Sequence, residues 1–108
     1  MILYHGINKK DIDSIVEDGL NSGSYWGNLE EALKYTDCSQ VISVDTDTSD
    51  LSILPNYTLI EYYRDKDDEL YSEWVMSKQT WEDSLKLFGS VIIEEKMMID
   101  YEDIKNMN

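Results

Sequence analysis

The chain has 108 residues, 42% of them hydrophobic, which is enough for one globular domain with a single core. Nine basic residues against 23 acidic ones give a formal net charge of −14 at pH 7, which excludes the basic surface that binding to nucleic acid or to an anionic membrane requires. One cysteine and one histidine leave too few ligands for a structural zinc site and no partner for an intramolecular disulfide.

The first part of the chain predicts a strand followed by a helix. Residues 1–6, MILYHG, have the apolar pattern and the closing glycine of a short strand. Residues 8–20, NKKDIDSIVEDGL, carry apolar side chains on one helical face, so they predict a helix. Asn8 is expected to cap this helix, and Gly19 is expected to terminate it.

A loop and a second helix are predicted next. Residues 21–27, NSGSYWG, are rich in glycine and serine, which is typical of a loop. Asn28 is expected to cap a helix that ends near Asp37, with Ala32 and Leu33 pointing inward.

The middle of the chain predicts two strands and a loop. Residues 40–45, QVISVD, predict a strand that leads into a polar turn. Pro55 and Asn56 interrupt the chain, and residues 57–63, YTLIEYY, predict a further strand because they are rich in β-branched and aromatic side chains. Residues 64–73, RDKDDELYSE, show no clear period, so their acidic cluster is expected to form a solvated loop.

The last part of the chain predicts a third helix and two short strands. Residues 81–88, WEDSLKLF, predict a helix between a Thr80 cap and a Gly89 stop. Residues 90–104, SVIIEEKMMIDYEDI, predict two strand-like runs on either side of the Glu94-Glu95 pair.

These elements favour an α+β fold in one compact domain over residues 1–108, with short strands and about three helices. No apolar run approaches the roughly 20 residues of a membrane helix, so no membrane partner is expected. Residues 1–10, MILYHGINKK, lack the pattern of a signal peptide, and Cys38 is expected to be an inert thiol, so we expect a cytoplasmic protein. The acidic surface is expected to attract a protein with a basic surface; the simpler alternative is that it serves only solubility.

The stretch GSYWGNLEEALKYTD, residues 23–37, places Tyr25 in a glycine-flanked loop and Tyr35 ten residues later, after a capped helix. Two aromatic side chains in this arrangement can belong to a hydrophobic core, or they can form a slot for a flat ring. Core packing is the expected role of the three tryptophans, Trp26, Trp74 and Trp81.

Short motifs in a fixed order resemble the ADP-ribosyltransferase fold, in the His-Tyr-Glu branch that includes poly(ADP-ribose) polymerases, diphtheria-type toxins and small bacterial and phage proteins. LYHG supplies His5-Gly6 at the end of a first strand, and Gly19-Leu20 ends the helix that follows. Tyr25-Trp26 matches the aromatic pair of the next loop, and Tyr35 matches the second tyrosine. In EEKMMIDYEDI, Glu95 stands where the family has a glutamate that opens a short apolar strand.

The resemblance implies that NAD is a substrate and that the chain transfers ADP-ribose to a protein. His5 would hold a ribose of NAD, and Gly6 would bind the nicotinamide carboxamide through its backbone groups. Tyr25 and Tyr35 would enclose the nicotinamide ring, and Glu95 would accept a hydrogen bond from the ribose 2′-hydroxyl as the catalytic acid residue. These residue types suit the reaction, because a carboxylate stabilises positive charge that develops on the ribose and aromatic faces attract a cationic ring.

Each of these residues also has a structural interpretation. A histidine that follows a strand can serve only as a hydrogen-bonding residue, and Tyr25 and Tyr35 can serve only in packing. Glu94 faces the opposite side of any strand from Glu95, so only one of the two can point into a site. Glu73, in SEWVM, is a third candidate for the acid.

Two departures from the family pattern leave other functions open. Ile7 stands where the family commonly has Ser or Thr, and Ala32 stands where it has a serine that grips the carboxamide. One alternative is a catalytically inactive acidic protein that acts as a decoy and blocks a nucleic-acid-binding protein. Another is a module that binds a nucleotide or ADP-ribose without cleaving it. The size and acidity also resemble small phage inhibitors of host defence, so that role is a further hypothesis.

Overall fold

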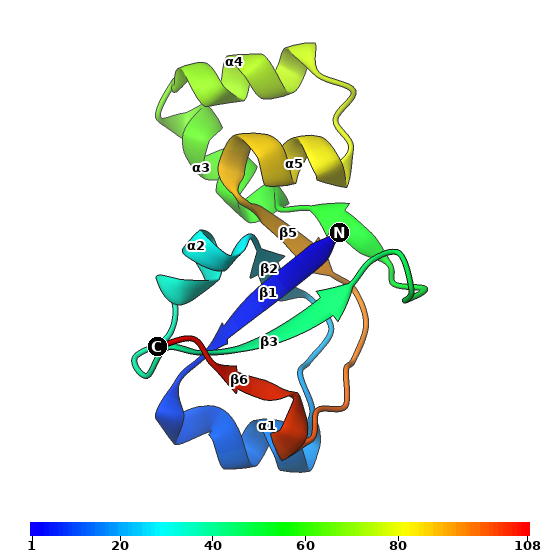
Figure 1. Ribbon diagram of the computed structural model, residues 1–108. Helices are drawn as coiled ribbons and strands as arrows, with labels where there is room; N and C mark the ends of the chain where they lie inside the picture. Colours follow the sequence, from blue (N-terminus) through cyan, green and yellow to red (C-terminus); the bar gives the residue numbers. More distant parts are fainter.

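A six-stranded antiparallel sheet runs through the structure in the order β4-β5-β2-β1-β3-β6 (Figure 1). The computed structural model describes all residues, 1–108. The strands are β1 (Ile2–Ile7), β2 (Ser24–Gly27), β3 (Gln40–Asp45), β4 (Ile53–Pro55), β5 (Ser90–Ile93) and β6 (Ile104–Asn106). The α-helices are α1 (Ile12–Asp18), α2 (Leu29–Leu33), α3 (Tyr57–Asp65), α4 (Glu69–Met76) and α5 (Trp81–Phe88). The predicted α+β class is confirmed, but the chain has five helices and not about three.

The helices lie at three places around the sheet (Figure 1). The helices α3, α4 and α5 pack together at one end, beside β4 and β5, and α1 lies at the opposite end. The short helix α2 lies over β1. The longest helix, α3, has nine residues, and no helix here has the length and apolar character to cross a membrane.

The main core forms on one face of the central strands. Leu3 and Ile7 of β1 alternate with exposed or half-buried neighbours, as the two-residue period of a strand requires. They pack with Trp26 of β2 and with Val91 and Ile93 of β5, all of which are almost fully buried. This core holds the inner strands together and fixes the position of each strand relative to its neighbours.

A second, smaller core explains why residues 57–63 form a helix and not the predicted strand. In α3, the buried Ile60 packs against Trp74 of α4 and Phe88 of α5. Leu59 and Tyr63, at helical spacing, cover the same cluster. The Asn56 side chain caps α3 by accepting a hydrogen bond from Leu59 N at 3.1 Å. Tertiary packing and a cap therefore outweigh the β-propensity of this segment.

Four further local predictions were wrong. The predicted loop 21–27 contains strand β2, which pairs with β5 along its whole length. The predicted loop 64–73 contains most of α4, which begins with an Asp68 cap and buries Trp74. The second helix ends at Leu33 and does not reach Asp37. Asn8 does not cap α1: its side chain accepts a hydrogen bond from Asp37 N at 3.1 Å, and Asp11 holds the cap position.

Other predicted helix ends are confirmed. Asn28 caps α2 by accepting from Glu31 N at 2.9 Å, and Thr80 with Asp83 forms a capping box at α5. Gly89 ends α5 in a left-handed conformation with φ of 74°. Of the two predicted final strands, the first is β5; the second run lies mostly outside strands, and β6 forms only at Ile104–Asn106.

Candidate functional site

The strands β1 and β2 separate immediately after a single pair. β1 is paired with β3 along its whole length, but with β2 only at Tyr4 and Gly27. Antiparallel strands direct backbone groups alternately to the two neighbours, and Thr46 N donates to Met1 O at 2.8 Å, so the odd residues of β1 face β3. The N–H and C=O of Gly6 therefore face β2, where Gly6 has no paired residue.

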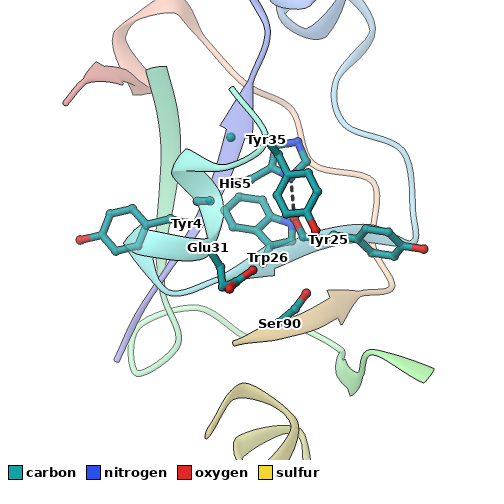
Figure 2. A pocket seen from close by; sticks show the side chains of 10 residues that line it. Tyr4, His5, Tyr25, Trp26, Glu31, Tyr35 and Ser90 are labelled. Carbon is teal, nitrogen blue, oxygen red and sulfur yellow. Dashed lines mark hydrogen bonds between the residues drawn. The ribbon is translucent and has the colours of Figure 1, made fainter. Parts of the chain in front are cut away.

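A cavity of about 150 Å³ lies at this separation. Three consecutive residues from β1 and three from β2 line it, which is expected of an opening between strands because successive side chains point to opposite faces. The remaining lining comes from α2, from Tyr35 two residues after its end and from the start of β5. The lining residues are Tyr4, His5, Gly6, Tyr25, Trp26, Gly27, Glu31, Ala32, Tyr35 and Ser90 (Figure 2).

His5 bridges the two separated strands. Its Nδ1 lies 2.6 Å from the carbonyl oxygen of Tyr25 (Figure 2). Because a carbonyl can only accept, Nδ1 carries the proton and donates, which leaves Nε2 of the neutral ring as an acceptor. Burial lowers the pKa of His5, and the hydrogen bond to Tyr25 opposes this effect only in part. The ring also contacts Trp26, with ring centroids 5.3 Å apart.

The two predicted tyrosines stand at the rim of the cavity. Tyr25 is 47% exposed and Tyr35 is 64% exposed, so neither belongs to a core. In Figure 2 the Tyr35 ring overhangs the cavity, whereas the Tyr25 ring points outward. Trp26, by contrast, is 1% exposed and forms part of the cavity wall. The stretch 23–37 thus supplies both a core residue and two exposed aromatic rings.

Gly6 allows α2 to approach β1 closely. A Cβ at this position would lie against the carbonyl oxygen of Ala32, closer than any ordinary contact, and 3.2 Å from the carbonyl carbon of Tyr35. Only a residue without a side chain fits here. The absence of a side chain at Gly6 therefore determines how close α2 lies to β1, and so where Tyr35 lies above the cavity.

A buried polar network fixes Ser90 at the start of β5. Its Oγ accepts a hydrogen bond from Asn56 Nδ2 at 2.9 Å, and its carbonyl accepts from Ser84 Oγ at 2.7 Å. Ser84 Oγ in turn accepts from Asn56 N at 3.0 Å. Asn56 and Ser84 are 3% and 0% exposed, so this network ties the helical end of the molecule to the cavity.

The predicted NAD-binding residues and the predicted acid lie in different places. His5, Gly6, Tyr25 and Tyr35 all line the one cavity. Glu95 does not line it, and its Oε1 accepts a hydrogen bond from Ser52 N at 2.6 Å. The short apolar strand predicted after Glu95 is absent: β5 ends at Ile93, before Glu95, and residues 96–99 form only an isolated bridge between Met97 and Leu20.

Glu94 and Glu73 do not line the cavity either. The carboxylate that does is Glu31 of α2, which the sequence interpretation did not single out. The only signal for it in the sequence was its place three residues after the Asn28 cap, where an acid is common for helix stability alone. Cys38 lies outside the cavity, half-buried, with Sγ 3.4 Å from the Ile7 carbonyl oxygen.

A second hollow adjoins the cavity. It has a volume of about 230 Å³ and shares Tyr25, Tyr35 and Ser90 with the first. Its other walls come from the start of α3, where Leu59 and Tyr62 line it. The two hollows together form one cleft that runs past both exposed tyrosines.

Comparison of the chain with protein-family models, with curated proteins and with solved structures finds no match in any of the three. Membership of the ADP-ribosyltransferases therefore stays a prediction.

Proposed function

We propose that this chain is an NAD-dependent mono-ADP-ribosyltransferase that modifies a protein. The observation that carries the proposal is the gathering of His5, Gly6, Tyr25 and Tyr35 around one cavity. They come from β1, from β2 and from the segment after α2, so their proximity depends on the fold and not on their spacing in the chain.

The cavity offers groups that complement nicotinamide. A carboxamide carries two N–H donors and a carbonyl acceptor. The unpaired backbone edge of Gly6 carries one donor and one acceptor and faces the opening between the strands. Tyr35 and Tyr25 provide aromatic faces for a cationic ring, and exposed side chains of this kind change rotamer within nanoseconds. A volume of about 150 Å³ suits one ring, with the rest of the dinucleotide lying along the adjoining hollow.

A neutral His5 suits a cationic substrate. Because burial lowers its pKa, His5 carries no charge at pH 7 and does not repel the positive nicotinamide ring. Its Nε2 is then free to accept a hydrogen bond from a ribose hydroxyl. The Nδ1 bond to Tyr25 fixes the orientation of the imidazole.

The proposed reaction breaks the bond between nicotinamide N1 and ribose C1′. The bonding electron pair leaves with nicotinamide, which becomes neutral, and positive charge develops on the ribose. A nucleophilic side chain of the target forms the new bond to C1′ and loses its proton to solvent. A carboxylate beside the ribose lowers the barrier because it stabilises this developing charge.

The net charge of −14 favours a target with a basic surface, because opposite charge speeds encounter and suppresses wrong partners. A protein that binds nucleic acid has such a surface, and it would be a fitting target for an inhibitor of host defence.

The test is incubation of the purified protein with labelled NAD and a bacterial lysate. We expect label on a discrete protein band and release of nicotinamide. Tyr35→Ala should weaken NAD binding by about 0.5–2 kcal/mol, or roughly 2- to 30-fold. Tyr57→Ala is the matched control, because Tyr57 is also exposed, at 51%, but lines neither hollow. Equal effects of the two substitutions on NAD affinity would refute the assignment of this cavity as the nicotinamide site.

A second function is favoured by the polar partners of the Glu95 and Glu31 carboxylates. Glu95 is held by Ser52 N, and Glu31 lies 2.7 Å from Lys34 Nζ, so each already has a partner. This arrangement suits a module that binds NAD or ADP-ribose without cleaving it. NAD would then raise the melting temperature and be recovered intact, whereas the transferase consumes it.

A further inference from the structure

We propose that Glu31, and not Glu95, supplies the carboxylate that stabilises the positive charge on the ribose. This inference rests on the proposed function and names the residue that the proposed reaction needs. Among the ten lining residues of the cavity, Glu31 is the only acid. It reaches the cavity from α2, whereas the family resemblance places the acid at the start of an apolar strand.

Gly89 makes room for the Glu31 side chain. A Cβ at Gly89 would lie 2.5 Å from Glu31 Cγ and 3.2 Å from Cδ. A Cβ at Gly27 would lie 3.4 Å from Glu31 Cβ, which is an ordinary van der Waals contact, so Gly89 alone leaves the space. The side chain therefore runs over the backbone of Gly89, in space that any other residue at position 89 would occupy. The Glu31 side chain therefore passes Gly89 at one edge of the cavity.

That edge is the beginning of β5. Gly89 immediately precedes Ser90, the first residue of the strand. Figure 2 shows the Glu31 carboxylate and the Ser90 hydroxyl group on the same side of the cavity. The carboxylate from α2 and the first residue of β5 thus line the same part of the cavity. Ser90 is fixed there by the hydrogen bond from Asn56.

Lys34 is a partner that a substrate can displace. Its Nζ lies 2.7 Å from Glu31 Oε1, one helical turn away, and the Lys34 side chain is 59% exposed. Exposed ion pairs of this kind contribute only about 0–1 kcal/mol. The Glu31 side chain is 26% exposed, so it is more sheltered than the Lys34 side chain. In the reaction, Glu31 accepts a hydrogen bond from a ribose hydroxyl while the N1–C1′ electron pair leaves with nicotinamide.

The test compares nicotinamide release and NAD affinity in matched variants. Glu31→Gln keeps the shape of the side chain but removes its charge. We expect its rate of nicotinamide release to fall by about a hundredfold or more, while its Kd for NAD changes less than tenfold. Glu30→Gln is the control, because Glu30 is the neighbouring acid on α2, is exposed and does not line the cavity. Its rate should equal that of the wild type.

Thermal unfolding of each variant separates loss of chemistry from loss of fold. Glu31→Gln with the wild-type melting temperature and the wild-type rate would overturn the inference while leaving the transferase in place. A rate lost in Glu95→Gln and retained in Glu31→Gln would overturn it in favour of Glu95. A wild-type protein that binds NAD and releases no nicotinamide would overturn it in favour of a binding module. A wild-type protein that does not bind NAD would remove the proposed function and the inference together.

Discussion

Gly6→Ala is expected to displace α2 and damage both stability and the cavity. The added Cβ would lie less than 3.0 Å from the Ala32 carbonyl oxygen, whereas ordinary contacts begin at 3.4 Å. The neighbour is backbone, so it cannot swing aside as a flexible side chain would. The α2 segment must withdraw by more than 0.4 Å, and it carries Ala32 and Tyr35 with it.

The size of the effect follows from two opposing contributions. Overpacking of this kind costs about 1–3 kcal/mol. Replacement of glycine by alanine in an extended strand recovers about 0.4–1 kcal/mol, because the unfolded chain loses conformational freedom. The net loss is about 1–2 kcal/mol, which corresponds to a fall in melting temperature of roughly 5–15 °C for a domain of this size.

Urea and thermal unfolding followed by circular dichroism measure this loss, and isothermal titration with NAD measures its effect on the cavity. Ser43→Ala on β3 is the control, since Ser43 is an exposed residue paired with Tyr4 and should change stability little. Gly6→Ala with wild-type or higher stability would show that the close approach of α2 to β1 does not constrain the fold. Unchanged NAD affinity in a destabilised Gly6→Ala variant would refute the link between α2 and the cavity.

Two further predictions concern His5 and Asn56. In the folded protein the pKa of His5 lies below its ordinary value near 6.5. Below pH 6.5 the unfolded chain therefore binds more protons at this residue than the folded chain does. The contribution of neutral His5 to the free energy of unfolding is complete above pH 6.5 and is lost as the pH falls. The difference in unfolding free energy between the wild type and His5→Gln, measured from pH 7.5 to 5, should show this slope, and a flat difference would contradict it. Asn56→Ala should cost about 2–4 kcal/mol, because it removes a cap and a buried hydrogen bond to Ser90, whereas Asn28→Ala removes an exposed cap and should cost about 1 kcal/mol. Equal urea midpoints for the two alanine variants would show that the buried network adds nothing.

Local signals in the sequence predicted the elements whose structure depends on neighbouring residues. The alternation in β1, the run of β3, the Asn28 and Thr80 caps and the left-handed Gly89 are all present in the structure. Each of these features involves residues within a few positions of one another. For that reason a single stretch of sequence carries the whole signal.

The predictions that the structure contradicts concern segments whose conformation depends on residues far away in the sequence. Residues 57–63 read as a strand from their side chains, but Trp74 and Phe88 provide a surface that a helix covers better. The second helix was predicted too long because nothing in its sequence shows that β1 stands directly beneath Ala32. The order of motifs predicts that Glu95 opens a short strand, but no strand follows it: β5 ends at Ile93, and residues 96–99 form only an isolated bridge between Met97 and Leu20.

The sequence by itself determined the acidity, the α+β class and several helix ends, and it singled out three of the six residues that line the cavity from β1 and β2, His5, Gly6 and Tyr25. Only the tertiary structure decided that β1 and β2 part after one pair and that the acid lining the resulting cavity is Glu31. The physical reason is that the gap between β1 and β2 depends on how each strand pairs and packs with other elements of the fold. β1 is paired with β3, and β2 is paired with β5. The close approaches at Gly6, Gly27 and Gly89 allow α2 to lie next to both β1 and the start of β5.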